Sequence, residues 1–158
     1  MKGNPKIIDV LNKLLAEELG AINQYMVHSE MYDNWGYEKL HHKIEKNAMD
    51  EMKHAEALMQ RILFLEGMPA VTKLGPIRIG KAIPEMITND IGGEATAIKS
   101  YNEAVQLAVQ LEDNGSRALF EKILQDEEGH IDLLECQRDQ IGQMGLENYL
   151  PVQTEKKE

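Results

Sequence analysis

Apolar side chains recur at spacings of three and four residues in four long segments of the chain, which is the periodicity of one helix face. The first segment begins at Asn4-Pro5, where a capping residue precedes a proline suited to the first helical turn. It ends near the turn-forming residues 33–36. The second segment ends at Gly67 and Pro69, which stop a helix. The other two flank the turn at residues 113–115, and Gly142 and Gly145 are expected to break the last.

Residues 67–82 lack this periodicity and are rich in glycine and proline. Connections in helix bundles are normally short, so a connection of about 16 residues needs a structural reason. Sixteen extended residues reach up to roughly 50 Å, whereas a helix of about 28 residues is roughly 42 Å long. The connection can therefore run the length of the bundle, which makes the second and third helices parallel. Residues 146–150 predict a short fifth helix, followed by a mobile tail from about residue 152.

Composition narrows the class of protein. A length of 158 residues suits one all-α domain, residues 1–158. The net charge of -10 argues against nucleic acid as a partner, because phosphate binding needs a basic surface. The single cysteine, Cys136, excludes an internal disulfide and a four-cysteine metal site. Neither a signal peptide nor the roughly 20 apolar residues of a membrane span is apparent, so we expect a cytoplasmic protein without a membrane partner.

Two copies of one motif interrupt the apolar faces. Residues 50–54 and 126–130 both read D-E-x-x-H, and they lie 76 positions apart. The same offset relates Glu18 to Glu94 and Tyr25 to Tyr101. The chain therefore contains two related halves, each with a carboxylate, a tyrosine and an E-x-x-H motif.

Six residues of this repeat are expected to face the bundle interior: Glu18, Glu51, His54, Glu94, Glu127 and His130. Glutamate and histidine three positions apart project from one helix face. Four buried carboxylates are unstable unless they are paired, protonated or bound to cations. Two divalent cations would cancel their charge, and iron, manganese and zinc accept these ligand types. The set matches the known pattern of di-iron carboxylate four-helix bundles, so it is a match to that pattern rather than an independent deduction.

A single E-x-x-H motif is common in helices and has little meaning alone. Glu38 and His41 form a third copy, which we interpret as coincidental because no carboxylate stands 33 residues before it. A zinc-protease site is excluded because Asp50, not histidine, precedes Glu51. A metal-free bundle with protonated carboxylates, acting as an interaction or structural protein, is the alternative from a different functional class.

Other candidate residues are less decisive. If the first and third helices are antiparallel, the Tyr25 and Tyr101 hydroxyls reach the opposite carboxylates and orient them; the alternative is ordinary core tyrosine. His28, His41 and His42 have no partners at ligand spacing and are expected on helix surfaces. Met52 projects about 100° away from Glu51, toward the outside of the bundle. An outward methionine is typical of a packing contact between subunits.

Nearly the whole chain resembles the bacterioferritins, the haem-containing ferritin-like family. The resemblance is carried by residues 1–3, 11–13, 21–25, 34–36, 50–55, 61–67, 126–132 and 145–149. It implies a ferritin-like antiparallel four-helix bundle with a long crossover, assembled as a 24-subunit shell of haem-bridged dimers. It also implies storage of a ferric mineral inside that shell.

The resemblance also assigns roles to individual residues. The six residues would be the ligands of two irons per subunit, with Glu51 and Glu127 bridging them and His130 as a mobile ligand. Met52 would be an axial ligand of haem b shared between two subunits. Four residues would line an iron-uptake pore between subunits: Asn34, Glu66, Asp132 and Asp139. Many members have histidine where this chain has Lys46, so an inner-surface iron site beside Asp50 is not expected here.

The function expected from this resemblance is iron storage and detoxification. The chain would be a ferroxidase, an Fe(II):oxygen oxidoreductase, that uses O2 or H2O2, and the haem would assist iron release with a small ferredoxin as electron donor. A rubrerythrin-type peroxide reductase normally needs a C-x-x-C module, which a single cysteine excludes. A haem-free ferritin is distinguished by Met52.

Overall fold

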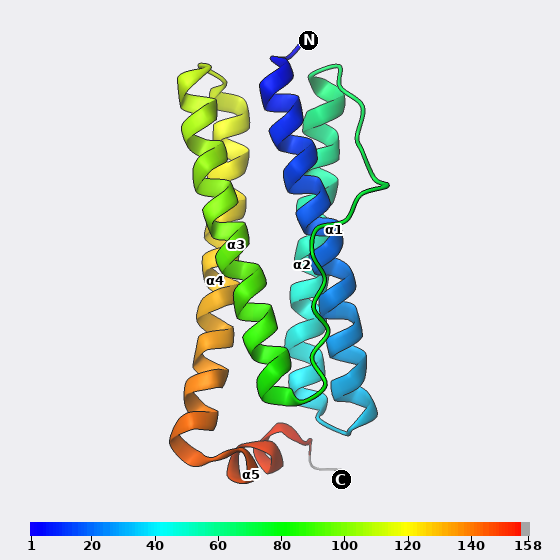
Figure 1. The fold of residues 1–158 in the computed structure, drawn as a ribbon, viewed down its shortest axis with the longest axis vertical. Helices are drawn as coiled ribbons and strands as arrows, with labels where there is room; N and C mark the ends of the chain where they lie inside the picture. Colours follow the sequence, from blue (N-terminus) through cyan, green and yellow to red (C-terminus); the bar gives the residue numbers. More distant parts are fainter. Residues whose placement is uncertain (156–158) are drawn as a thin grey trace.

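The computed structural model describes residues 1–155, which form an elongated bundle of four long helices (Figure 1). The elements are α1 (Pro5–Asn34), α2 (Glu38–Phe64), α3 (Ile83–Gln110), α4 (Asn114–Met144), α5 (Leu146–Tyr149) and the 3-10 turn η1 (Leu150–Gln153). Between α2 and α3 the chain returns along the length of the bundle (Figure 1). Helices α2 and α3 are therefore parallel, as the length of the connection predicts, and the predicted four-helix bundle with a crossover and a fifth helix is confirmed.

The helix boundaries follow the capping chemistry. The Asn4 side chain accepts a hydrogen bond from the Lys6 amide at 2.9 Å, and Pro5 occupies the first turn of α1. The Asp113 carboxylate accepts from the Ser116 amide, so residues predicted as a turn form the first turn of α4 instead. The expected break at Gly142 is wrong, because α4 continues to Met144 and ends at Gly145, whose φ is 80°.

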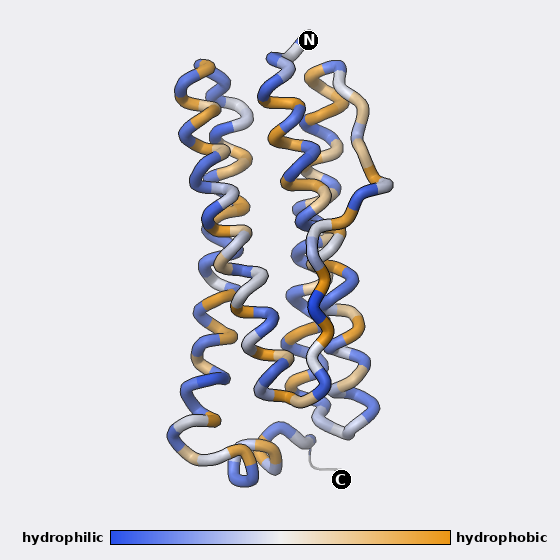
Figure 2. Tube along the Cα trace, in the orientation of Figure 1, coloured by the Kyte–Doolittle hydropathy of each residue, from blue (hydrophilic) through white to orange (hydrophobic). Residues whose placement is uncertain are grey.

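The apolar core consists of two clusters separated by a polar layer. One cluster contains Leu11, Leu58, Tyr101 and Phe120 among its buried members. The other contains Tyr32, Ile44, Ile87 and Leu134. On every long helix the buried glutamate lies between residues of the two clusters: Glu18, Glu51, Glu94 and Glu127. Figure 2 shows hydrophobic and hydrophilic positions alternating along each of the long helices, as expected for helices with one apolar face.

The crossover is held against α1 by hydrogen bonds that its backbone amides donate to one carbonyl oxygen and two side chains of α1. The Gly75 amide donates to the Ala16 carbonyl oxygen at 2.7 Å. The Arg78 amide donates to Gln24 Oε1 at 2.9 Å, and the Gly80 amide donates to His28 Nε2 at 3.0 Å. The predicted surface position of His28 is therefore wrong: the crossover covers this side chain and leaves it fully buried.

The other two histidines of that prediction differ from His28. His42 is exposed, as predicted. His41 is partly buried, and its Nδ1 lies 2.9 Å from the Ser29 carbonyl oxygen. Among residues 1–155, no helix combines the length and apolar character that crossing a membrane requires.

The C-terminal segment folds back onto the bundle. Tyr149 is buried and its hydroxyl donates to Gln137 Oε1. Residues 150–153 form a helical turn in which Gln153 is buried, so the segment for which a mobile tail is predicted begins with an ordered turn. Mobility remains a prediction, and residues 156–158 lie outside the described part of the chain.

Two consecutive glycines in the middle of α3 lack a packing reason. A Cβ atom added at Gly92 or Gly93 would meet nothing within 4 Å. Glycine inside a helix destabilises it by roughly 0.5–1 kcal/mol relative to alanine. We therefore expect Gly92→Ala and Gly93→Ala each to raise the free energy of unfolding by about that amount, measured by denaturant titration. Gly20→Ala should do the opposite, since its Cβ would lie 2.9 Å from the Gly75 carbonyl oxygen.

Candidate metal centre

The polar layer brings all six residues of the repeated motif together. Helices α1 and α3 each contribute one glutamate, and α2 and α4 each contribute a glutamate and a histidine one turn apart. All six side chains are buried: Glu18, Glu51, His54, Glu94, Glu127 and His130. The layer is at mid-height because each of these residues lies near the middle of its helix.

Two overlapping groups of potential ligand atoms are present in the described structure. One contains Glu18, Glu51, His54 and Glu127, and the other contains Glu51, Glu94, Glu127 and His130. Within each group the ligand atoms lie within 4.8 Å of one another. Glu51 and Glu127 belong to both groups, so the geometry matches two adjacent cation sites with two shared carboxylates.

The closest contacts join nitrogen and oxygen atoms. His54 Nδ1 lies 3.2 Å from Glu51 Oε2 and 3.2 Å from Glu127 Oε1. His130 Nδ1 lies 2.9 Å from Glu51 Oε1, yet neither atom has a hydrogen bond of acceptable geometry. Glu94 Oε2 and Glu127 Oε1 are also buried without hydrogen-bond partners. Buried polar atoms are normally paired, so these converging atoms fit a site that receives cations.

Two tyrosines bind the carboxylates from across the bundle. The Tyr25 hydroxyl donates to Glu94 Oε1, and the Tyr101 hydroxyl donates to Glu18 Oε1. Both contacts connect α1 with α3, as expected for antiparallel helices. Each tyrosine therefore limits the rotation of one glutamate, which is more than the packing of an ordinary core tyrosine.

Two aspartates contact the outer nitrogens of the histidines, and the sequence reasoning missed this. Asp126 Oδ2 lies 3.0 Å from His54 Nε2, and Asp50 Oδ2 lies 3.3 Å from His130 Nε2. Each aspartate thus holds the histidine of the other half, with the ring turned so that Nδ1 faces the layer. The repeated Asp in both D-E-x-x-H motifs was the available signal.

Burial and mutual repulsion control the ionisation of the glutamates. Burial raises the pKa of Glu18 and Glu127 well above the ordinary range, and the nearby Glu51 carboxylate raises both further. Burial likewise raises the pKa of Glu94. Burial also opposes the ionisation of Glu51, but the close polar groups of Glu18, His130 and His54 outweigh it and lower the pKa of Glu51.

The two histidines also have raised pKa values, although burial alone would lower them. Burial opposes the protonation of His130, but the Glu51 and Glu94 carboxylates outweigh it and raise the pKa of His130 to about 11. The pKa of His54 is also raised, because Glu127, Glu18 and Glu51 outweigh the effect of burial. Without cations, protons therefore stabilise the layer.

The remaining sequence candidates lie away from this layer. Met52 is 39% exposed on α2. Lys46 donates a hydrogen bond to Asp50 Oδ2 at 3.0 Å. A cationic side chain therefore lies beside Asp50, in agreement with the expectation that this chain has no inner-surface iron site there. The four residues assigned to an uptake pore are exposed and are not brought together within one chain. Asn34 and Glu66, for example, lie near opposite ends of the bundle (Figure 1).

Comparisons with known proteins agree with this geometry. Residues 8–144 match the model of the ferritin family, described as a ferritin-like domain. The chain is 44% identical over 149 residues to "Bacterioferritin" of Brucella melitensis biotype 1, covering 94% of this chain and 92% of the relative. The chain belongs to the bacterioferritin family. "Bacterial ferritin" of Synechocystis sp. is 46% identical over 154 residues, covering 97% and 99% of the two chains. "Bacterioferritin" of Rhodobacter capsulatus is 43% identical over 149 residues, covering 92% of each.

Membership of the bacterioferritins confirms the resemblance seen in the sequence and gives iron storage as the general function. The buried glutamate and histidine groups are consistent with iron binding.

Cation binding should displace protons from the layer. The raised pKa values mean that Glu18, Glu127 and His130 hold protons at a pH where their unperturbed counterparts hold fewer. Ligand atoms must be deprotonated to bind a metal ion, so the affinity for Zn²⁺ should rise with pH while the pH is below the raised pKa of His130, about 11. Titration calorimetry in two buffers of different protonation enthalpy measures the proton release. Equal heats in both buffers would contradict this expectation.

Proposed function

We propose that this chain is a ferroxidase that oxidises Fe(II) to Fe(III) with O2 or H2O2 and stores the product as a ferric mineral. The observation that supports it most is the pair of overlapping ligand groups with two shared carboxylates. The donor set of four carboxylates and two imidazoles suits iron. The formal charge of four ionised carboxylates is equal in magnitude and opposite in sign to that of two ferrous ions, so two bound ions would neutralise the carboxylates in the apolar core.

The proposed roles follow from the two groups. Glu18 and His54 hold one ferrous substrate ion, Glu94 and His130 hold the other, and Glu51 and Glu127 bridge them. Two Fe(II) ions together lose two electrons, which one H2O2 and two protons accept to form two waters. Tyr25 and Tyr101 keep their glutamates oriented, and the aspartates keep the histidine rings turned toward the ions. The protein's contribution is therefore positioning and charge compensation.

Exposed methionines on α1 and α2 support a second part of the proposal, the binding of haem. Met52, Met49 and Met26 are exposed by 39%, 46% and 53% of their surface. Exposed apolar groups of this kind are typical of surfaces that are covered in an assembly. We propose that Met52 would hold a b-type haem shared by two subunits. When bound, the haem supplies an electron-transfer step for iron release, with a small ferredoxin as the donor.

The complete proposed assembly is a cytoplasmic shell of 24 subunits built from haem-bridged dimers. Each subunit is a single ferritin-like domain of residues 1–158, and the uptake pore is formed between subunits. Its residues are exposed in the single chain, which agrees with a pore that only assembly creates. No role in binding nucleic acid or membranes is proposed.

The ferroxidase proposal is tested by mixing the protein with two Fe(II) per subunit and O2 or H2O2, and following Fe(III) absorbance. Glu18→Ala should slow the rapid phase by roughly 100-fold or more, because one ion loses a ligand and its orientation. Glu121→Ala, which removes an exposed α4 carboxylate paired with Arg117, is the matched control and should leave the rate unchanged. Absence of a rapid phase in the unmodified protein would favour the metal-free structural alternative.

The haem proposal is tested by the absorption spectrum of the purified protein. We expect a low-spin b-haem spectrum at about one haem per two subunits, as a two-methionine site shared between subunits requires. Met52→Leu should abolish that spectrum, while Met68→Leu, which changes a methionine exposed by 79% on the crossover, should preserve it. A normal haem spectrum in the Met52→Leu protein would refute the assignment.

A further inference from the structure

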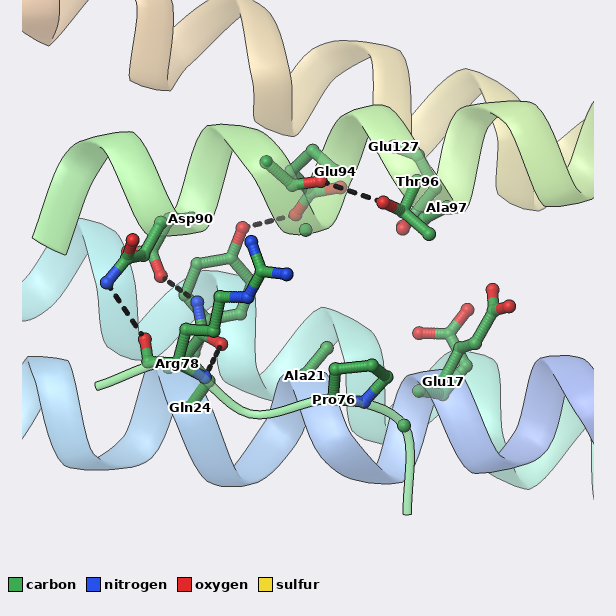
Figure 3. A pocket seen from close by; sticks show the side chains of 16 residues that line it. Glu17, Ala21, Gln24, Pro76, Arg78, Asp90, Glu94, Thr96, Ala97 and Glu127 are labelled. Carbon is green, nitrogen blue, oxygen red and sulfur yellow. Dashed lines mark hydrogen bonds between the residues drawn. The ribbon is translucent and has the colours of Figure 1, made fainter. Parts of the chain in front are cut away.

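A third group of potential metal ligands lies outside the polar layer. Glutamates of the layer line a cavity of about 130 Å³ between α1, α3 and the crossover (Figure 3). The third group consists of His41, His42 and Glu45, which lie in the first two turns of α2 and take no part in that cavity. None of these three residues has a role in the proposed ferroxidase or haem site.

The ligand atoms of this group converge. Each of the three residues offers one ligand atom within 4.8 Å of the other two, and the two imidazole ring centroids are 5.1 Å apart. His41 and Glu45 are one helical turn apart, so both project from the same face of α2. This partner of His41 was not predicted from the sequence.

The spacing of His41 and Glu45 suits a shared ion. His41 Nε2 lies 3.3 Å from Glu45 Oε2. Two ligand atoms bound to one tetrahedral zinc ion are also about 3.3 Å apart, because each bond is about 2.0–2.1 Å long. The pair is therefore already at the separation that one bound ion requires.

The orientation of His41 is fixed through its other ring nitrogen. His41 Nδ1 lies 2.9 Å from the Ser29 carbonyl oxygen. A carbonyl oxygen can only accept a hydrogen bond, so Nδ1 carries the hydrogen and Nε2 of the neutral ring keeps a lone pair. Metal-binding histidines commonly have this arrangement. Nε2 and the Glu45 carboxylate are then both acceptors, so a proton or a cation between them is needed to make their contact favourable.

The C-terminal segment brings a further carboxylate to the group. Glu155 Oε1 lies 3.6 Å from His42 Nε2. The Glu155 amide donates a hydrogen bond to Glu38 Oε2 at 3.2 Å, which holds this residue beside the start of α2. The side chains of His42 and Glu155 are 60% and 55% exposed, so both can rotate toward an ion. With Glu155 the group has the four ligands of a tetrahedral site.

The charge and ligand types favour a divalent transition metal. Glu45 and Glu155 supply two negative charges, and neutral imidazoles suit zinc and similar ions better than magnesium or calcium. The positive end of the α2 dipole opposes a cation here, because the helix begins at Glu38. The Glu38 carboxylate lies in that first turn and offsets this effect.

We propose that His41, His42 and Glu45 form a third cation site, which binds Zn²⁺ or a similar divalent transition-metal ion with Glu155 as the fourth ligand. The bound ion joins the start of α2 to the C-terminal segment, and the hydrogen bond of His41 extends the connection to α1. The ion therefore fastens the C-terminal segment to the bundle. The site shares no ligand with the proposed ferroxidase or haem site and does not depend on either.

The test counts the Zn²⁺ ions bound per subunit of the assembled protein by competition with a coloured chelator. His42→Gln changes an exposed ligand and should lower the count by one ion per subunit. Glu45→Gln should weaken the binding of the same ion by at least about tenfold, since loss of even an outer partner of a metal ligand costs that much. Glu121→Gln is the matched control and should leave the count unchanged, because Glu121 is also an exposed glutamate paired with the residue four positions before it.

Hydrogen exchange tests whether the ion fastens the C-terminal segment. Zn²⁺ should slow the exchange of the amides of residues 150–155 in the unmodified protein and in Glu121→Gln, but not in His42→Gln. Equal Zn²⁺ counts in the unmodified protein and in folded His42→Gln would overturn the site. If His42→Gln does not fold, Glu45→Gln provides the same comparison. Loss of the ion without any change in exchange would overturn its role in holding the segment.

A variant of the polar layer separates this site from the metal centre. Glu18→Ala removes a ligand of the layer and should leave the His42-dependent ion in place. Loss of that ion in Glu18→Ala would overturn the independence of the third site. An unmodified protein whose only bound Zn²⁺ is the ion removed by His42→Gln would refute the metal centre and support the third site.

Discussion

The structure depends on a layer of buried carboxylates that an apolar core cannot accommodate without compensation. Glu18, Glu51, Glu94 and Glu127 divide the core into two clusters, one on each side of the layer. Each cluster is an ordinary apolar core of a helix bundle and stabilises the fold. The buried carboxylates of the layer lower the stability of the fold, but they provide the candidate metal ligands. Protons, hydroxyl donors and imidazoles reduce that conflict without cations, and two divalent ions would remove it.

Hydrogen bonds from two tyrosines and contacts with two aspartates fix the orientation of the glutamates and histidines in this layer. Tyr25 and Tyr101 cross between α1 and α3, while Asp50 and Asp126 each contact the histidine of the other half. Every contact therefore joins the two halves of the repeat rather than residues of the same half. The two copies of the motif form one centre because neither half supplies its own supporting groups. The crossover makes this possible by bringing α3 beside α1 in the antiparallel direction.

Much of the fold and of the candidate site could be predicted from the sequence, because both depend on periodicity. The spacing of apolar residues located the four helices, and the constant offset between the halves identified all six side chains of the layer. Contacts that depend on the path of an irregular segment could not be predicted: His28 is buried only because the crossover lies over it. The open space beside Gly92 and Gly93 could not be predicted either. The periodicity of apolar residues indicates which side chains pack together, but it does not show where a cavity lies. The repeated Asp was a sequence signal for Asp126, but its contact with His54 depends on how the helices pack and follows only from the structure.

The sharing of Glu51 and Glu127 between the two ligand groups has a thermodynamic consequence. An ion in one group would hold both carboxylates in place and displace the proton that the raised pKa of Glu127 favours, so part of the organising free energy for the neighbouring group would already be supplied. The affinities of the two positions would then be linked reciprocally, and an ion in either position would favour binding of the second ion. In the proposed ferroxidase, a subunit with Fe(II) in both positions would hold two reducing equivalents, which matches an oxidant that accepts electrons in pairs. Cooperative filling would thus suppress one-electron side reactions before any redox step begins.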